Sequence, residues 1–219
     1  MKPLVIFGTG DIARLAHYYF TKDAKREVAA FTVDAPFRQG EEYLGLPLVD
    51  FEEAQSRYPP ARFEGFVALS YRGMNHLRAD KYAAMKERGY TLASYVSGRC
   101  SWLIDEPPGD NCFILEDNTV QPFVKIGANV TLWSGNHIGH DSVIDDHCFI
   151  SSHVVVSGHC RIGPYCFVGV NATLRNGIAL AAETLVGAGA VIMKDTVEKG
   201  VYMAPRAELF KKKSDEIEL

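Results

Sequence analysis

The chain has 219 residues, 47% of them hydrophobic, which is enough for one large domain or two small ones with packed cores. Its 23 Lys and Arg against 27 Asp and Glu give a formal net charge of −4, which argues against general nucleic-acid binding. The first apolar stretch, at residues 4–7, is far shorter than a signal-peptide core, and no 18 apolar residues follow one another. We therefore expect a cytoplasmic protein that does not bind membranes.

Residues 1–95 predict a small Rossmann-like α/β domain with a parallel sheet. A strand over residues 4–7 is followed by the turn Gly8-Thr9-Gly10-Asp11-Ile12-Ala13 and by an apolar-periodic helix to about Tyr19. Further along the chain we expect a strand ending at Val33 and Asp34, a helix over 51–58, a strand over 65–70, a helix over 75–88 and a strand over 91–96.

The Gly-x-Gly-x-x-Ala turn allows a phosphate to approach the backbone at a helix N-terminus. Asp34, at the end of the second strand, is placed to accept hydrogen bonds from a sugar or a base. A tight strand-to-helix turn without a ligand is the alternative. A full dinucleotide-binding domain needs about twice this length, so hydride transfer is disfavoured.

A six-residue repeat organises the second half of the chain. Starting at Ile114, every sixth residue is Ile, Leu or Val: Ile114, Val120, Ile126, Leu132, Ile138, Ile144, Ile150, Val156, Ile162, Val168, Leu174, Leu180, Val186 and Ile192. This period fits short strands separated by turns, with three hexads in each coil. The sequence thus predicts a parallel β-helix over residues 96–203, followed by a tail over 204–219.

Two further positions of the repeat, the fourth residue after each anchor and the residue directly after it, also allow predictions. Small or medium residues recur four positions after each anchor, and all five cysteines fall in this phase, so we expect them to fill the core. Glycines directly follow five anchors, at positions 127, 139, 163, 169 and 187. We expect these glycines to occupy turn positions with unusual backbone angles.

The pattern [Ile/Leu/Val]-Gly-x-x-small-x resembles the hexapeptide-repeat acyltransferases. With the preceding α/β domain, nearly the whole chain closely resembles the nucleotide-sugar N-acetyltransferase and sialic-acid O-acetyltransferase-like family, which includes bacillosamine and perosamine N-acetyltransferases. The resemblance implies a left-handed β-helix, a homotrimer and acetyl-CoA as cosubstrate. It also implies that Gly8, Gly10 and Asp34 hold the nucleotide of a sugar nucleotide.

Arg72 is a further candidate for the nucleotide site. It lies in the loop after the third predicted strand, at the carboxyl edge of the sheet, where ligands of α/β domains bind. From there its guanidinium group could contact a phosphate. A solvated surface arginine is the alternative.

Five of the seven histidines lie between residues 137 and 159. They occupy different phases of the repeat, so a closed metal site is not indicated and we expect no metal. Within this segment, His140-Asp141 matches the family's catalytic stretch, which implies that His140 is the general base and Asp141 its orienting partner. The alternative is an outward-facing polar pair.

One coil of three hexads spans 18 residues, so stacked positions differ by 18 in number. His140 is therefore predicted to stack on Gly158, and Asp141 on His159, which would allow His159 to pair with Asp141 across a coil. Some family members use a second histidine nine residues after the first. This chain has Phe149 there.

Small residues along the coil edges suit an extended pantetheine arm, and we name Gly169, Asn171 and Gly187 as candidate acetyl-CoA contacts. Arg206 is a candidate for the CoA phosphates, because the segment around it partly matches relatives with a basic residue at this point. The alternative for Gly169 and Gly187 is that the turns alone require glycine. The alternative for Arg206 is a solvated charge near the end of the chain.

Together with the His140-Asp141 pair, the resemblance implies an acetyl-CoA-dependent N-acetyltransferase. Its expected acceptor is the amino group of a nucleotide-linked, dideoxy-type amino sugar used for surface glycans such as lipopolysaccharide. O-acetylation of a sugar hydroxyl is the alternative within enzymes, since the same base would serve. A non-catalytic trimeric scaffold that binds sugar nucleotides is the alternative from another class.

Overall fold

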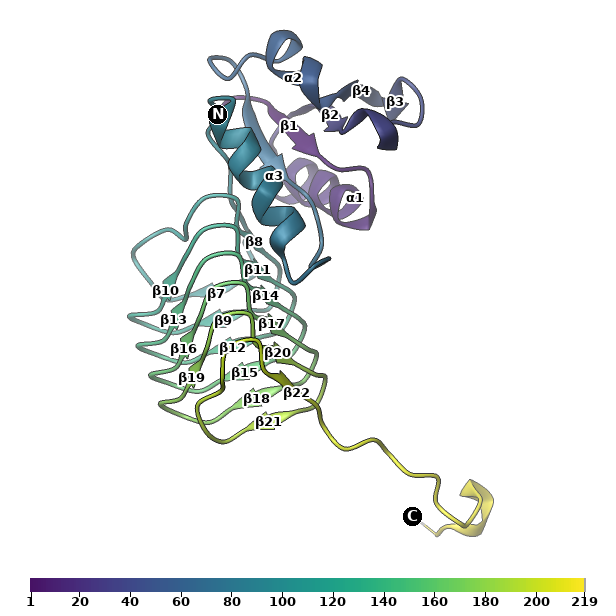
Figure 1. Cartoon of the computed structure of the whole chain (residues 1–219), viewed down its shortest axis with the longest axis vertical. Coiled ribbons are helices and arrows are strands. Elements are labelled where there is room, and N and C mark those ends of the chain that lie inside the picture. Colours follow the sequence, from purple (N-terminus) through teal and green to yellow (C-terminus); the bar gives the residue numbers. More distant parts are fainter. Residues whose placement is uncertain (219) are drawn as a thin grey trace.

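The computed structural model describes residues 1–218. Leu219, the last residue of the predicted tail, lies outside the described residues. A small α/β domain, here called the cap, lies at one end of a triangular parallel β-helix, and the C-terminal segment extends from the other end (Figure 1). The predicted fold class is confirmed, with the β-helix left-handed.

The cap contains a five-stranded sheet in the order β3-β4-β2-β1-β5. Its strands are β1 (Leu4–Phe7), β2 (Val28–Val33), β3 (Glu42–Tyr43), β4 (Leu46–Asp50) and β5 (Glu64–Val67). Its helices are α1 (Asp11–Tyr18), continued by the π-helical turn η1 (Tyr19–Asp23), α2 (Phe51–Arg57), α3 (His76–Glu87) and the short 3-10 turn η2 (Ala35–Phe37). Within residues 1–218, no helix has the length and apolar character needed to cross a membrane.

The sheet differs from the prediction at its edge. The sequence analysis did not predict β3 and β4, which pair antiparallel around a two-residue turn in which Leu44 and Gly45 both have positive φ. Strand β4 also pairs parallel with β2 and so extends the sheet. Pro47 in β4 lies opposite Glu42 of the edge strand β3, near the sheet edge, where a residue without a backbone N–H is tolerated.

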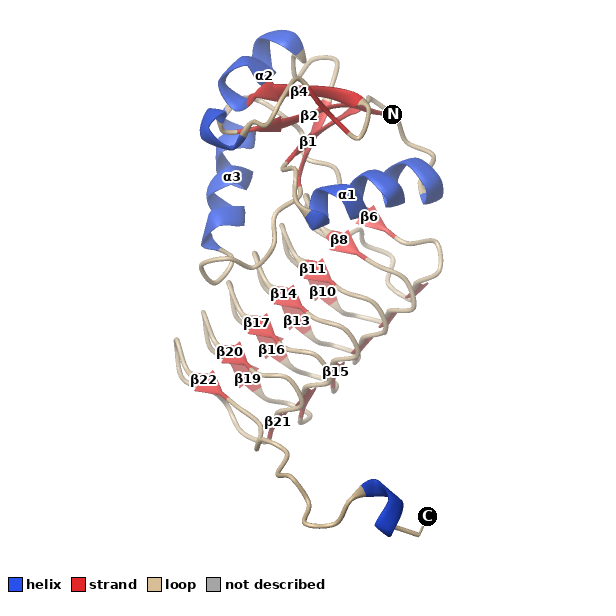
Figure 2. Ribbon diagram, turned by 90° about the vertical axis from the view of Figure 1, so that its right-hand side faces the viewer, coloured by secondary structure: helices blue, strands red, loops and turns tan. Residues whose placement is uncertain are grey.

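The β-helix has three flat faces that follow one another along each coil (Figure 2). Face 1 comprises β6 (Tyr95–Val96), β8 (Phe113–Ile114), β11 (Thr131–Leu132), β14 (Phe149–Ile150), β17 (Phe167–Val168), β20 (Leu185–Val186) and β22 (Val201–Tyr202). Face 2 comprises β7 (Ser101–Trp102), β9 (Thr119–Val120), β12 (His137–Ile138), β15 (Val155–Val156), β18 (Thr173–Leu174) and β21 (Val191–Ile192). Face 3 comprises β10 (Lys125–Ile126), β13 (Val143–Ile144), β16 (Arg161–Ile162) and β19 (Ala179–Leu180). The tail carries one 3-10 turn, η3 (Ser214–Glu216).

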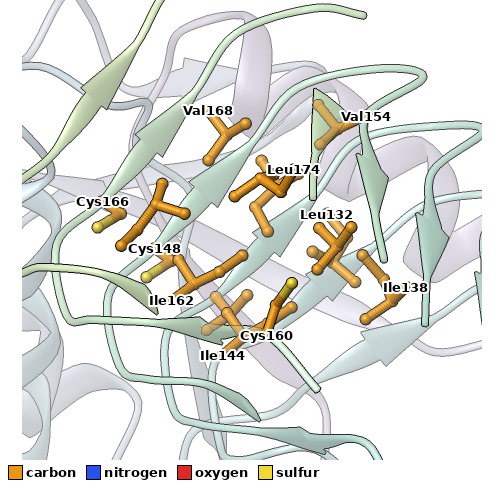
Figure 3. Close-up of a cluster of buried hydrophobic side chains, with 14 of the residues drawn as sticks. Leu132, Ile138, Ile144, Cys148, Val154, Cys160, Ile162, Cys166, Val168 and Leu174 are labelled. Carbon is orange, nitrogen blue, oxygen red and sulfur yellow. The ribbon is translucent and has the colours of Figure 1, made fainter. Parts of the chain in front are cut away.

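The repeat anchors form the core of the coil, as predicted. Each anchor is the second residue of its strand and is buried, and the side chains from the three faces point toward one another inside the prism (Figure 3). Cys112, Cys148, Cys160 and Cys166 are buried among them, Cys100 is partly buried, and all five are free thiols. The prediction that the cysteines fill the core is confirmed.

The prediction of unusual backbone angles at the glycines that follow anchors is wrong. The glycines that follow anchors do not adopt the left-handed conformation. The left-handed residue lies two positions after each of these glycines, as at Asp141 (φ 57°), Tyr165 (φ 61°) and Asn171 (φ 58°). A Cβ atom added at Gly139 would lie 2.5 Å from the backbone nitrogen of Gly158 in the next coil. These glycines are therefore required by the close stacking of coils and not by unusual backbone angles.

The predicted strand over residues 91–96 is divided between the two parts of the chain. Leu92 forms a single bridge with Gly65 at the edge of the cap sheet, whereas Tyr95–Val96 pairs with β8 of face 1. Tyr95 packs in the core of the cap, and Val96 packs against the core of the β-helix. The chain passes from one sheet to the other between these residues.

The cap packs on face 1 and on the corner between faces 3 and 1, here called the cap corner (turn residues 127–130, 145–148, 163–166 and 181–184). The Tyr71 ring lies 5.0 Å from the ring of Phe149 and 4.7 Å from that of Phe167, both on face 1. Asn75 donates from Nδ2 to the carbonyl oxygens of Tyr165 and Cys166 at the cap corner. The corner between faces 2 and 3 lies opposite the face that the cap covers.

Candidate active site

His140 and Asp141 lie on the corner between faces 2 and 3, here called the His140 corner (turn residues 121–124, 139–142, 157–160 and 175–178). Nδ1 of His140 lies 2.8 Å from Oδ2 of Asp141, and both side chains are about half exposed. Because a carboxylate only accepts hydrogen bonds, Nδ1 carries the proton and the lone pair of a neutral imidazole lies on Nε2. Among residues 1–218, no group hydrogen-bonds to Nε2.

Backbone geometry fixes this pair. The backbone nitrogen of His140 donates to Oε1 of Gln121 in the preceding coil, at 2.9 Å. Asp141 occupies the left-handed corner position, with its backbone nitrogen bonded to the Pro122 carbonyl oxygen at 3.2 Å. The β-helix thus presents an oriented imidazole with a free nitrogen on a rigid corner, which is suited to removing a proton from a bound acceptor.

The residues one coil further lie where the 18-residue spacing predicts. A Cβ atom on Gly158 would come within 2.7 Å of Nε2 of His140, so the ring rests on this glycine. Nε2 of His159 lies 4.0 Å from Oδ2 of Asp141, and the two imidazole rings meet edge to face at 4.9 Å. Donor atoms of His140, Asp141 and His159 lie within 4.8 Å of one another, close enough to ligate a metal ion. The absence of a metal stays a prediction.

Phe149 occupies the place at which some relatives carry a second histidine. Its side chain is buried, lies against Tyr71, and belongs to the contact between the cap and the β-helix. The structure therefore gives this residue a packing role on face 1, away from the His140 corner.

A second candidate site is a pocket of about 690 Å³ at the carboxyl ends of β1, β2 and β5 in the cap. Its lining includes four predicted residues, Gly8, Gly10, Asp34 and Arg72. Gly8 has φ 122°, and a Cβ atom there would lie 2.7 Å from the Ala68 carbonyl oxygen. Gly10 is the N-cap of α1, and space around it is open, so the helix N-terminus faces the pocket without a side chain in the way.

Sequence reasoning did not identify Lys81, which also lines this pocket. Nζ of Lys81 lies 2.7 Å from Oδ1 of Asp34, and the ammonium group lies over the rings of Phe7 and Phe51 at 5.3 and 5.4 Å. Lys81 reaches the pocket from α3, far along the chain from Asp34. No motif or spacing links the two residues, so only the packing of α3 against the edge strand β5 of the cap sheet reveals the pair.

The predicted acetyl-CoA contacts lie elsewhere. Gly169 and Gly187 are buried in turns between faces 1 and 2, and Asn171 is exposed on the same corner. This corner and the His140 corner flank opposite edges of face 2, so one chain does not bring them together. Arg206 is exposed in the C-terminal segment.

The fold and these two sites define a two-part hexapeptide-repeat protein, with an α/β cap on a left-handed β-helix. A family model described as bacterial transferase hexapeptide (six repeats) matches residues 126–158 and 141–176. Solved structures match almost the whole chain, which confirms the fold that the sequence resemblance implied.

Three of these structures illustrate the match. The acetyltransferase domain of PglB from Neisseria gonorrhoeae is 19% identical, with a TM-score of 0.80 over 93% of this chain and 97% of that one. PerB from Caulobacter crescentus, in complex with CoA and GDP-perosamine, is 22% identical, with a TM-score of 0.81 over 93% and 95% of the two chains. WeeI from Acinetobacter baumannii AYE is 17% identical, with a TM-score of 0.75 over 92% and 94%.

Proposed function

We propose that the protein is an acetyl-CoA-dependent N-acetyltransferase that acts on the amino group of a nucleotide-linked amino sugar. The observation that carries this proposal is the His140–Asp141 pair, with its 2.8 Å contact and an unoccupied Nε2 on a rigid exposed corner. Support comes from the shared fold with PerB, whose structure holds CoA and GDP-perosamine, and with the acetyltransferase domain of PglB, also solved with acetyl coenzyme A.

In this proposal, His140 accepts a proton at Nε2 from the amino group as its nitrogen attacks the thioester carbonyl carbon. Asp141 holds the imidazole in the required tautomer and stabilises the cation that forms. The C–S bond then breaks, and the protonated His140 gives its proton to the departing sulfur, so that CoA leaves as the thiol. Gly169, Asn171, Gly187 and Arg206 remain the proposed acetyl-CoA contacts.

The cap pocket is the proposed nucleotide site. Backbone N–H groups at the N-terminus of α1, opened by Gly8 and Gly10, suit a diphosphate, and Arg72 adds a cation at the pocket wall. Asp34, oriented by Lys81, offers a carboxylate to N–H or O–H groups of the base or ribose. Apolar neighbours such as Phe37 and Leu77 provide surfaces for a base.

We further propose a homotrimer. The nucleotide pocket belongs to a cap that packs on face 1, whereas His140 lies on the opposite corner of the β-helix. A site that uses both therefore needs the cap of one subunit and the His140 corner of a neighbour, and closed threefold symmetry supplies three such sites.

Light scattering on the purified protein should therefore give three times the 24.2 kDa chain mass at micromolar concentration. A mixture of two impaired variants, His140→Asn and Asp34→Ala, is assayed with the nucleotide sugar below its Kd for Asp34→Ala. After exchange of subunits it should be more active than the average of its two components, because some sites then combine an intact cap with an intact His140. A monomer mass, or a mixture no more active than the average of its two components, would contradict the shared site.

Acceptor chemistry tests the function itself. The protein is incubated with acetyl-CoA and with matched nucleotide sugars that carry an amino or a hydroxyl group at the same carbon, and thiol release is measured. We expect release with the amines. Release with only the hydroxyl sugars would identify an O-acetyltransferase, and no release with any acceptor would favour the non-catalytic scaffold. The role in surface glycan synthesis and the cytoplasmic location stay predictions.

Asp34→Ala should weaken binding of the nucleotide sugar by roughly 10-fold or more, because a hydrogen bond to a charged group is worth about 1.5–3 kcal/mol. Affinity for acetyl-CoA should stay within about twofold, since its proposed contacts lie on the β-helix and in the C-terminal segment, outside the cap. Calorimetric titration with each ligand measures the two values separately. Equal losses for both ligands, or none for either, would count against the assignment of the cap pocket.

A further inference from the structure

The loop that brings Arg72 to the cap pocket has an unusual backbone. Three consecutive residues, Gly73, Met74 and Asn75, have φ values of 63°, 51° and 69°. Two of them are not glycine, and a run of left-handed residues is unfavourable for L-amino acids. Such a conformation persists only where its surroundings hold it, and it often marks a functional site.

Arg78, on the first turns of α3, holds both ends of this loop. Its Nη1 donates to the Ser70 carbonyl oxygen at 3.2 Å and to Oδ1 of Asn75 at 3.0 Å. Arg78 is only 2% exposed, and none of its hydrogen-bond acceptors among residues 1–218 is a carboxylate. Desolvation lowers the pKa of Arg78 to about 10, so the side chain stays charged at neutral pH.

The same guanidinium group also binds the β-helix. Nη2 donates to the carbonyl oxygens of Asn129, His147 and Cys148 at 3.2, 3.0 and 3.1 Å, and Nε donates to Oδ1 of Asn129. These acceptors lie in two successive coils of the cap corner. Asn75, itself fully buried, adds the bonds to Tyr165 and Cys166 in the coil beyond.

We infer that Arg78 is a positioning residue for the nucleotide: it fastens the strained 70–75 loop to the β-helix and so holds Arg72 and Gly73 at the wall of the cap pocket. The pocket is thus preorganised by contacts with the β-helix and not by the cap alone. This inference rests on the proposed nucleotide site. It gives a function to the buried Arg78, which takes no part in the proposed proton transfer to His140.

Arg78→Lys tests the inference, because lysine keeps the charge but cannot make the forked contacts. UDP, GDP and dTDP are titrated calorimetrically into the wild-type protein, and the tightest binder serves as the probe. If release of the loop leaves a tenth of the molecules competent to bind, the Kd of the probe should rise roughly 10-fold. The Kd of acetyl-CoA should change by less than about twofold.

Two comparisons separate positioning from general destabilisation. Arg72→Met should raise the Kd of the probe in the wild-type background and add little in Arg78→Lys, since the loop already fails to present Arg72. Arg88→Met, at the end of α3, removes a contact with Glu52 within the cap. It should lower the melting temperature without changing the Kd of the probe.

Wild-type affinity in Arg78→Lys would overturn the inference. The inference would also be overturned if Arg72→Met raised the Kd of the probe by the same factor in the wild-type and Arg78→Lys proteins. A Kd increase in Arg88→Met as large as that in Arg78→Lys would overturn it too. If Arg78→Lys does not fold, Asn75→Gly keeps the left-handed backbone and removes the amide that Arg78 binds, and the same Kd increase is expected. A wild-type protein that binds none of the three diphosphates would refute the proposed nucleotide site and this inference with it.

Discussion

His140→Asn is expected to lower kcat by roughly 10²- to 10⁴-fold, the usual contribution of a general base. Asparagine keeps size and polarity at position 140 but has no basic nitrogen for the amine proton. The His140 side chain is half exposed on its corner, so its replacement should leave the proposed trimer and the melting temperature close to wild type. Steady-state kinetics with acetyl-CoA and the amino-sugar nucleotide provides the measurement.

Asp141→Asn is the matched comparison, because it removes the orienting charge and leaves the imidazole in place. It should lower kcat by a smaller factor than His140→Asn does. Residual activity in His140→Asn is expected, since a bound amine near its own pKa is partly nucleophilic and the site still supplies proximity. Wild-type kcat in His140→Asn would refute the base assignment, and His147, His153 and His159 would then be the residues to replace.

Gly163→Ala is expected to destabilise the β-helix by roughly 3 kcal/mol, at the upper end for overpacking. A Cβ atom at this position would lie 2.9 Å from the backbone nitrogen of Ala182 and 2.9 Å from the carbonyl oxygen of Leu180. These are backbone atoms of the next coil, held by parallel pairing, so they cannot move aside as a flexible side chain would. Urea denaturation of wild type and variant measures the difference.

Gly177→Asn is the control for this prediction. Gly177 has φ 74° and open space around its Cα, and asparagine already occupies the equivalent corner position at residue 171. Its free energy of unfolding should therefore change by less than about 1 kcal/mol, because asparagine tolerates the left-handed conformation well. A larger loss in Gly177→Asn than in Gly163→Ala would show that backbone angles, and not coil stacking, require these glycines.

Much of the fold follows from local sequence, because a strict repeat leaves few alternatives. The six-residue spacing predicted the coil, its buried anchors and the core position of the cysteines, since each strand contributes one inward residue of fixed phase. The same period placed Gly158 and His159 beside His140 and Asp141, since one coil of three hexads brings residues 18 apart into contact. In the cap, apolar runs and helix signals predicted β1, α1, α2 and α3, but the hairpin of β3 and β4 was missed.

The sequence by itself determined what repeats or local motifs encode: the β-helix, the His140 corner, and the glycine turn and Asp34 at the cap pocket. Tertiary structure alone decided how these parts meet. Lys81 pairs with Asp34 from a helix far along the chain, and Arg78 fastens the pocket loop to coils about 50 to 70 residues away. Such contacts have no period and no fixed spacing. The Lys81–Asp34 contact depends on how α3 packs on the cap sheet, and the Arg78 contacts depend on how the cap docks on the β-helix. Both are set by side-chain packing between elements distant in sequence.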